Sequence, residues 1–418
     1  MLGAIIGDIA GSRFEFDNHR SKEFDLFTDK CFATDDSIMT LAVAKAIMET
    51  ARSAGSGVVH DDAFYSVLGG MTVKYMRGIG QRYPHCGYGG RFHGWMFSRN
   101  PEPYNSFGNG AAMRISPAGL AARTLSDVRR MSGAVTAVTH NHPEGIKGAE
   151  ATAVAVYLAR DGAPLEEIRE AIVRDYYPLD FTIDGIRETY RFNETCQETV
   201  PQAIEAVLES TSFEDAIRTA ISVGGDSDTL AAITGGIAEA YYGIPPDLRK
   251  RALRFLDGDL RAIYDEWAAF TAEDGAIPRF RPLTRYIETL SKVESFGGWI
   301  GGEQGDGTPG NPMRMPVMGY QPAAMEFVEE FYRFAAKHPE FGLNDYRAIL
   351  EKYGVDWGFD GMRGADVHAL DSRCVLAMIM TVIRVDRFCE GVLSSAFEEK
   401  MIGKWLERLK EIDEASSL

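Results

Sequence analysis

The sequence is poor in cysteine and has no hydrophobic run long enough to cross a bilayer. Its five cysteines are scattered and form no C-x-x-C pair, which is typical of reduced intracellular thiols and excludes a disulfide framework. The longest apolar run, residues 374–383, is closed by Arg384 and falls far short of the ~20 residues that a membrane span needs. The N-terminus has no basic segment, and Asp8 interrupts its apolar stretch, so it does not resemble a signal peptide. We therefore expect a cytoplasmic protein without a membrane span.

Basic residues are also scarce relative to acidic ones. There are 44 Lys and Arg against 61 Asp and Glu, which gives a formal net charge of −17. Sequence-independent binding to nucleic acid requires a basic surface that replaces phosphate counterions, and docking on anionic lipid requires the same sign of charge. Both partner classes are therefore unexpected. An apolar content of 45% is sufficient for an ordinary globular core.

Helical periodicity dominates what is present. Apolar residues recur at i, i+3 and i+4 in a series of segments, namely 38–50, 61–77, 126–139, 144–160, 165–176, 200–210, 213–223 and 229–242. Alternating patterns typical of strands are nearly absent. The pattern predicts an all-α fold, and a length of 418 residues predicts two or three domains at ~150 residues each.

Two stretches interrupt the helical pattern. Residues 78–110 are rich in Gly, Pro and aromatic residues, and a non-helical segment of that length inside a helical domain is more often functional than connecting. Residues 296–322 have the composition of an interdomain linker. We therefore expect a first domain over 1–295, a Gly/Pro-rich linker over 296–322 and a small helical domain over 323–418.

Two acidic motifs open helices at distant positions. The first is Thr34-Asp35-Asp36-Ser37, which taken alone is best explained as a helix cap. The second ends a Gly-Gly turn with Asp226, Asp228 and Thr229, and a cap needs only one such residue. If the two sets meet, they supply six oxygen ligands without Cys or His, which suits Mg²⁺ or Mn²⁺. Several carboxylates in one cavity would repel each other without cations.

Three further elements become informative in combination. The N-terminal segment 3–12 carries three glycines and Asp8, and Glu15 follows it between two phenylalanines, where burial would raise its pKa toward acid–base use. Residues 106–114 form a Gly-rich loop that leads into a helix, a pattern that can cradle phosphate. His140 lies in the turn 139–143. Taken one at a time, these features have simpler explanations: Glu15 as an exposed side chain, the glycines as packing residues and His140 as a helix cap.

Taken in order, these five elements resemble the ADP-ribosylglycohydrolase family over about residues 1–285. The resemblance implies a compact, orthogonal all-helical bundle with two Mg²⁺ ions, or Mn²⁺ in some members, at the base of an ADP-ribose cleft. It implies metal ligands in two sets, Thr34, Asp35 and Asp36 on one side and Asp226, Asp228 and Thr229 on the other. It implies catalytic roles for Glu15, Asp35 and Asp36, and ADP-ribose contacts for Ser106, Gly108, Asn109, Gly110 and His140.

The activity implied by this resemblance is metal-dependent hydrolysis of the glycosidic bond between ADP-ribose and an acceptor, which could be a protein side chain, a nucleobase or a small molecule. Cleavage at the anomeric carbon passes through an oxocarbenium-like state. The partner is then ADP-ribose or an ADP-ribosylated substrate. Two alternatives stay open: a Mg²⁺-dependent phosphoesterase or nucleotide hydrolase built from the same oxygens, and a non-catalytic ADP-ribose-binding protein. The C-terminal residues match no part of the hydrolase pattern, and no role is predicted for them.

Overall fold

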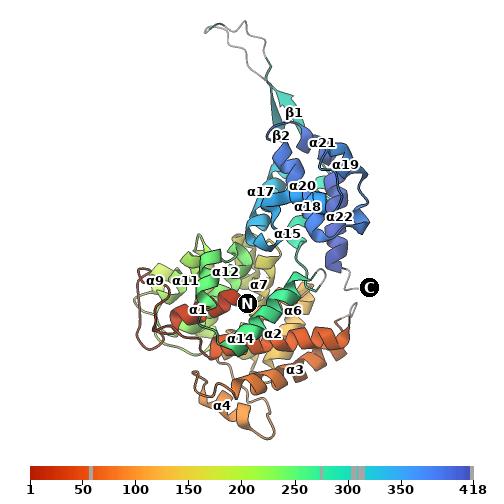
Figure 1. Ribbon diagram of the computed structural model, residues 1–418. Coiled ribbons are helices and arrows are strands. Elements are labelled where there is room, and N and C mark those ends of the chain that lie inside the picture. The colour runs from red at the N-terminus through yellow and green to blue at the C-terminus, as the bar shows by residue number, and fades with distance from the viewer. Residues whose placement is uncertain (56–59, 274–275, 303–307, 309–315, 415–418) are drawn as a thin grey trace. The chain divides into compact units, whose positions relative to one another are not determined.

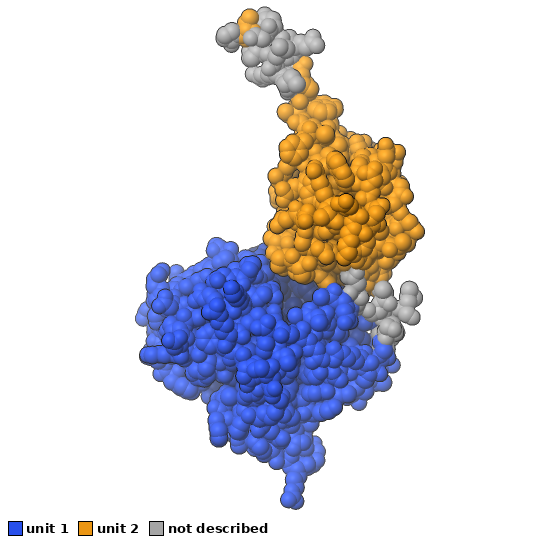
Figure 2. Space-filling view, in the orientation of Figure 1, with its two compact units in different colours: residues 1–278, 416–418 blue, residues 279–415 orange. Residues whose placement is uncertain are grey.

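The computed structural model describes residues 1–55, 60–273, 276–302, 308 and 316–414 (Figure 1). The chain divides into two compact units, residues 1–278 and residues 279–415 (Figure 2). Both units are built mainly of helices, which confirms the predicted all-α class. No described helix combines the length and the low charge that crossing a membrane requires.

The boundary between the units lies earlier than the sequence suggested. Residues 279–295, expected to close the first domain, contribute Phe280, Leu283 and Leu290 to the hydrophobic core of the second unit. They do so from the short helices α15 (Arg281–Thr284) and α16 (Tyr286–Ser291). Apolar spacing shows that a segment buries one face but does not show which core receives it. The structure therefore moves the boundary from 295 to 278.

The expected linker 296–322 contains two strands of the second unit. Strands β1 (Gly297–Ile300) and β2 (Val317–Tyr320) pair antiparallel, with Gly297 opposite Tyr320 and Ile300 opposite Val317. Most of the intervening part of the predicted linker, 303–307 and 309–315, lies outside the described residues. The described ends of the segment thus belong to a folded unit and do not simply connect two domains.

Fourteen α-helices make up the described part of the first unit, and one buried hydrophobic cluster unites them. The predicted non-helical stretch 78–110 is helical at its start and over 90–97, where α3 ends and α4 lies. In chain order the helices are α1 (Leu2–Gly11), α2 (Asp35–Ala54), α3 (Asp62–Gly80), α4 (Gly90–Phe97), α5 (Ser116–Ala121), α6 (Leu125–Thr136), α7 (Pro143–Arg160), α8 (Leu165–Asp175), α9 (Ile183–Ile186), α10 (Cys196–Leu208), α11 (Phe213–Ile221), α12 (Ser227–Tyr242), α13 (Pro246–Ala252) and α14 (Gly258–Ala272).

Helices α1 and α12 pack so closely in this unit that the backbone of one contacts the backbone of the other. Every residue of α1 is buried. A Cβ atom on Gly7 would overlap the carbonyl oxygen of Ala231, and one on Gly3 would overlap that of Gly235. Only glycine allows such an approach. The glycines of the N-terminal segment therefore serve packing, and this packing brings the end of α1 to the start of α12.

The second unit surrounds α20 with helices and has a core of its own. Residues 374–383, the longest apolar run of the sequence, lie in α20 and are buried. Trp405 and Phe331 pack in the same cluster from neighbouring helices. The remaining helices of the unit are α17 (Pro322–Lys337), α18 (Tyr346–Lys352), α19 (Phe359–Gly364), α20 (Ser372–Val385), α21 (Val392–Glu398) and α22 (Met401–Glu414).

Candidate active site

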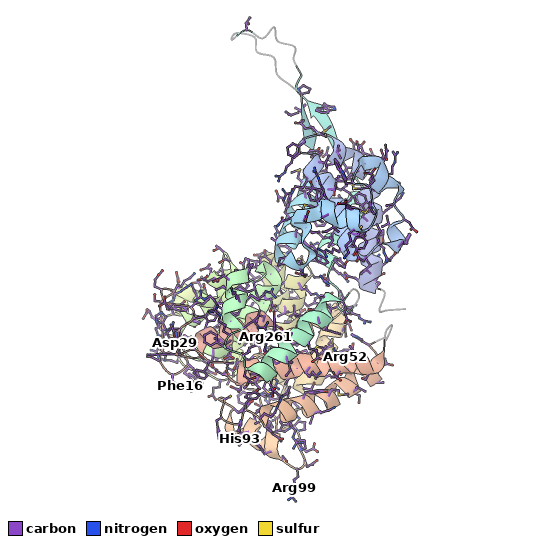
Figure 3. The ribbon with its side chains drawn as sticks, in the orientation of Figure 1. Phe16, Asp29, Arg52, His93, Arg99 and Arg261 are labelled. Carbon is purple, nitrogen blue, oxygen red and sulfur yellow. The ribbon has the colours of Figure 1, made fainter. Side chains whose placement is uncertain are left out.

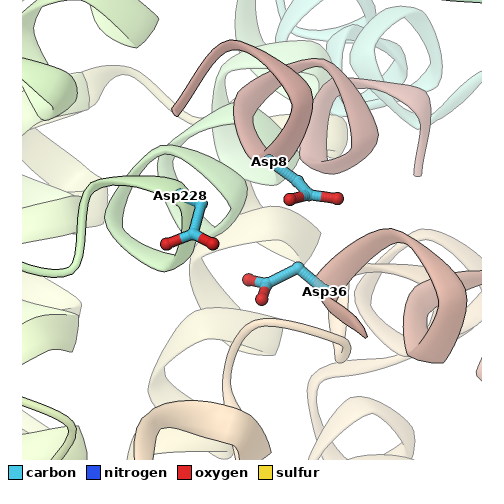
Figure 4. Close-up of side chains that lie close together, drawn as sticks. All are labelled: Asp8, Asp36 and Asp228. Atoms are coloured by element: carbon cyan, nitrogen blue, oxygen red, sulfur yellow. The ribbon is translucent and has the colours of Figure 1, made fainter. Parts of the chain in front are cut away.

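Three helices of the first unit direct carboxylates at one point. Asp8 comes from α1, Asp36 from the first turn of α2 and Asp228 from the first turn of α12 (Figure 4). One oxygen of each lies within 4.8 Å of the others. Thr229 Oγ1 is 3.5 Å from Asp36 Oδ2, although 193 positions separate the two residues. The two acidic motifs therefore converge in space, as the sequence predicted.

Asp8 was not among the predicted site residues, yet it anchors the first motif. Its carboxylate accepts hydrogen bonds from the Thr34 backbone N–H at 2.9 Å, the Thr34 hydroxyl at 2.7 Å and the Ser37 backbone N–H at 3.1 Å, and a fourth from the Ser37 hydroxyl. Burial raises the pKa of Asp8 to about 6, against the opposing effect of these hydrogen bonds. The signal in the sequence was a single charge in an apolar helix, which needs partners when buried.

A second group of carboxylates adjoins the first through Asp228. Oxygens of Glu15, Asp226 and Asp228 lie within 4.8 Å of one another. The Asn109 side-chain amide donates to Asp226 Oδ2 at 2.6 Å and fixes its orientation. Gly224 and Gly225 precede Asp226 with φ values of +78° and +72°, a conformation that favours glycine. The Gly-Gly turn is thus needed to bring Asp226 and Asp228 to the same place.

Crowding and burial disfavour negative charge at this site. Burial, followed by the neighbouring carboxylates, raises the pKa values of Asp36 and Asp228 well above their usual range. Burial likewise raises the pKa of Glu15 to about 7. Among the described residues, no Lys or Arg forms an ion pair with Asp36 or Asp228, and the buried Asp36 Oδ1 has no hydrogen-bond partner. A set of hard oxygens with an unpartnered buried carboxylate oxygen fits Mg²⁺ or Mn²⁺.

The remaining predicted ligands lie close to these groups but differ in their contacts. Thr34 is the N-cap of α2, and its hydroxyl accepts from the Asp36 backbone N–H at 3.3 Å. Asp35 belongs to neither carboxylate group. Its Oδ1 would lie 2.9 Å from a Cβ atom on Gly87, so the segment around Gly87 closely covers it. Burial, and then the charge of Asp8, raises the pKa of Asp35 well above its usual range.

A cleft of about 280 Å³ opens above the carboxylates. Except for Thr34, every predicted site residue lines it: Glu15, Asp35, Asp36, Ser106, Gly108, Asn109, Gly110, His140, Asp226, Asp228 and Thr229. Residues that the sequence did not single out complete the wall, among them Gly87, Arg91, Tyr104, Arg114 and Glu194. Part of the irregular segment 78–110 therefore forms one side of the cleft.

The glycine-rich loop and the turn that carries His140 present hydrogen-bond donors to the cleft. A Cβ atom on Gly108 or Gly110 would lie 3.6 Å from His140 Nε2, so the glycine-rich loop runs directly beside this ring. Arg114 Nη2 donates to Thr139 Oγ1 at 2.7 Å and approaches His140 Nδ1 at 3.4 Å, while Thr139 Oγ1 lies 2.8 Å from Nδ1. A guanidinium can only donate, so Nδ1 accepts and the proton of the neutral ring is on Nε2, facing the loop.

Burial keeps this histidine neutral. It lowers the pKa of His140 well below its ordinary value, and the charge of Arg114 lowers it further. His140 is therefore a fixed N–H donor at the cleft. Arg114 is itself buried, and no motif in the sequence marked it beyond its place at the end of the glycine-rich loop.

Comparison with known proteins assigns each unit separately. A family model described as ADP-ribosylglycohydrolase matches residues 1–278. A second model, described as a family of unknown function (DUF6508), matches residues 278–415. The meeting point of the two models coincides with the division between the compact units.

Named relatives resemble the first unit at low identity. ADP-ribosylarginine hydrolase Tri1 of Pseudomonas putida is 27% identical over 275 residues, which cover 59% of this chain and 71% of the relative. ADP-ribosylhydrolase ARH3 of Danio rerio is 26% identical over 322 residues, or 58% of this chain and 82% of the relative. ADP-ribosyl-[dinitrogen reductase] glycohydrolase of Rhodospirillum rubrum is 26% identical over 223 residues, or 50% and 69%.

Proposed function

The chain belongs to the ADP-ribosylglycohydrolase family through its residues 1–278, and from this membership we propose that its cleft hydrolyses the glycosidic bond between ADP-ribose and an acceptor with the help of divalent cations. The hydrolase activity follows from the family and from its named relatives. The dependence on two ions, Mg²⁺ or Mn²⁺, and the roles of individual residues are the finer part of the proposal.

One observation carries the metal dependence. Asp36 and Asp228 reach the same point from the first turns of two different helices, and the buried Asp36 Oδ1 finds no partner among the described residues. Leaving a buried carboxylate oxygen unpaired is costly. Asp36, Asp226 and Asp228 would hold the ions, with the hydroxyls of Thr34 and Thr229 and the Asp35 carboxylate at their border. Asp8 would position the first motif through its four hydrogen bonds.

Different parts of the cleft would bind different parts of the substrate, the diphosphate and the ribose that carries the scissile bond. The His140 Nε2–H and the backbone around Gly108 and Gly110 offer donors suited to a diphosphate. The acidic end then receives the ribose that carries the scissile bond. Divalent cations bound there supply charge neutralisation and Lewis acidity.

Glu15 is positioned for proton transfer. It lines the cleft beside Asp226 and Asp228 and is half-buried, and no hydrogen bond to its carboxylate is made by a described residue. Hydrolysis breaks the bond from the anomeric carbon to the acceptor, joins the water oxygen to that carbon and delivers one water proton to the acceptor atom. In this proposal Glu15 holds that proton between the two partners.

The test measures ADP-ribose release from defined ADP-ribosylated arginine and serine peptides, with Mg²⁺ and after exhaustive chelation. Release that requires the ion is the expected result. Asp36→Asn and Asp228→Asn should each reduce turnover by at least about 10³-fold, with unchanged far-UV circular dichroism. The exposed Asp180 provides the matched control, since Asp180→Asn should leave turnover unchanged.

Three outcomes would contradict the proposal in different ways. Full activity after chelation would remove the metal dependence. Phosphate release from nucleotides, with no cleavage of any ADP-ribosyl bond, would indicate a phosphoesterase. Binding of ADP-ribose in a calorimeter without hydrolysis of any adduct would indicate a non-catalytic binding protein.

A further inference from the structure

The loop that joins α1 to α2 covers residues 12–34 and contains no helix or strand. It runs along the surface of the first unit, where Figure 3 shows Phe16. Because the loop has no regular backbone pattern, its position depends on contacts made by its side chains. Asn18 and Arg20 make such contacts, and both reach the Gly-Gly turn, residues 223–225, that precedes the second acidic motif.

Asn18 contacts both glycines of this turn. Its Oδ1 accepts a hydrogen bond from the Gly225 N–H at 2.5 Å. The same oxygen lies 2.8 Å from the position of a Cβ on Gly224. The Gly225 N–H has no backbone acceptor among the described residues, so a side chain from another segment supplies the partner that a buried backbone donor requires.

Arg20 joins the Gly-Gly turn to an earlier segment of the chain. Its Nη1 donates to the Val223 carbonyl at 3.0 Å and to the Arg187 carbonyl, and its Nη2 donates to the Tyr190 carbonyl at 2.7 Å. Its Cζ lies 3.3 Å from the position of a Cβ on Gly224, so the guanidinium packs against the turn. One rigid group with several N–H donors thus holds three carbonyls from two segments.

The turn and the loop both carry carboxylates of the active site. Asp226 follows the turn directly, and oxygens of Glu15, Asp226 and Asp228 lie within 4.8 Å of one another. Asn18 and Arg20 are not among the described residues that line the cleft, so they act on these carboxylates only through the backbone that they hold. Groups placed behind the ligands of a metal ion orient those ligands, and their loss weakens metal binding.

Building on the function proposed above, we propose that Asn18 and Arg20 are positioning residues that hold the Gly-Gly turn in the conformation required for cation binding. The turn held in this way places Asp226 and Asp228 for the divalent cation. The same hydrogen bonds tie the loop that carries Glu15 to the turn. Binding of the cation and ordering of the loop are therefore coupled, since whatever stabilises the turn also stabilises the loop.

The experiment measures Mn²⁺ binding to the metal-free full chain by calorimetry, without substrate. We expect Asn18→Leu and Arg20→Met each to raise the Kd for Mn²⁺ by about tenfold or more. Asn18→Asp keeps an acceptor oxygen and Arg20→Lys keeps part of the donor set, so each should recover part of the affinity. Asn18 is exposed, so its variants should fold, which far-UV circular dichroism checks.

Hydrogen exchange tests the coupling between the turn and the loop. Saturating Mn²⁺ should slow exchange over residues 222–229 in the unmodified chain and in Arg20→Met, because the ion still binds the carboxylates there. Over residues 12–34 it should slow exchange in the unmodified chain only, because the variant lacks the bonds that transmit the effect. Equal protection of residues 12–34 in both proteins would overturn the coupling.

Arg218 provides the matched control. Among the described residues its guanidinium donates to Glu214 and to the carbonyls of Lys22 at 3.0 Å and Phe24 at 2.6 Å, which lie on the same loop. These bonds do not reach the Gly-Gly turn. Arg218→Met should therefore lower Tm, as Arg20→Met does, but leave the Kd for Mn²⁺ within about twofold of the unmodified value.

The possible contradictions are distinguishable. A lower Tm with unchanged Mn²⁺ affinity in Asn18→Leu and Arg20→Met would mean that these residues only stabilise the fold. An equal loss of affinity in Arg218→Met would mean that any loosening of the loop weakens the ion, and the positioning role would be overturned. Absence of Mn²⁺ binding by the unmodified chain would contradict the metal dependence proposed above, and the positioning role with it.

Discussion

At the scale of single residues, the carboxylates of the cleft oppose the stability of the fold. Asp8, Asp36 and Asp228 are almost completely buried within 4.8 Å of one another. Asp8 is compensated by four hydrogen bonds, but Asp36 and Asp228 are not compensated to the same degree. Such groups persist in proteins when function requires them. The consequence is that a bound cation should stabilise the fold as well as serve the reaction.

We predict that Mg²⁺ or Mn²⁺ raises the Tm of the first unit by roughly 5–10 °C when present at about a hundredfold excess over Kd. In the absence of metal, Asp228→Asn should raise Tm by about 3 °C because it removes a repelling charge, and it should abolish the rise on adding metal. Thermal scans of both proteins with and without the ion measure this. An equal metal-induced shift in the variant would exclude Asp228 as a ligand.

Arg114 offers a second test at this scale, because its guanidinium donates to Thr139 and approaches His140 Nδ1. Arg114→Leu removes the donor to Nδ1, and we expect the imidazole proton to be shared between both nitrogens. Loss of one oriented donor should raise KM by roughly tenfold, with a smaller change in kcat. The ¹⁵N chemical shifts of the His140 ring report the tautomer directly, and Arg114→Lys should restore it in part. An unchanged Nε2–H tautomer in Arg114→Leu would show that Thr139 alone fixes the ring.

The residues of the cleft differ in whether the sequence alone could identify them. Asp36, Asp226 and Asp228 were identifiable because their residue types and their positions at helix starts carry the chemistry. Arg114 and Glu194 were not, since an arginine in a turn and a glutamate in a loop have no special pattern until folding brings them to the cleft. Asp8 was noticed as an unexplained charge, but its partners Thr34 and Ser37 lie at the start of another helix.

At the scale of helices, the site depends on how closely α1 approaches α12. The glycines at positions 3, 7 and 11 recur every fourth residue and so share one face of α1. A Cβ on each would collide with the backbone of α12. The pattern in the sequence predicted small residues for packing, but only the structure identifies α12 as the partner. Because Asp8 and Asp228 lie on these two helices, the packing also sets their separation.

We predict that Gly7→Ala lowers the free energy of unfolding by about 2–3 kcal/mol, because the new methyl group overlaps the Ala231 carbonyl and the helices must separate. The expected fall in Tm is roughly 6 °C. Gly133 in α6 gives a control of opposite sign: nothing lies within 4 Å of its Cβ position, so Gly133→Ala should stabilise by about 0.5–1 kcal/mol. Chemical denaturation measures both changes, and similar effects for the two variants would contradict the packing argument.

At the scale of the whole chain, two separate hydrophobic cores account for the two units. The first core draws on residues between Met1 and Ile277, and the second begins with Phe280. The number of units could be predicted from the length and from the change of composition, but the boundary could not. Along the sequence, helices α15 and α16 continue the helical pattern of the first unit. Only their contacts show that their apolar faces belong to the second core.

We predict that residues 1–278 fold and hydrolyse ADP-ribosyl bonds without the second unit. Among the described residues, those that line the cleft all lie between Glu15 and Thr229, and none beyond Ile277 belongs to the first core. A chain ending at 278 should therefore keep kcat/KM within about threefold of the full chain and unfold in one cooperative transition. Calorimetry of the full chain should show that transition together with a second one, which a chain of residues 279–418 reproduces on its own. Loss of more than about tenfold in kcat/KM by a folded 1–278 chain would instead make the second unit part of the enzyme's working structure.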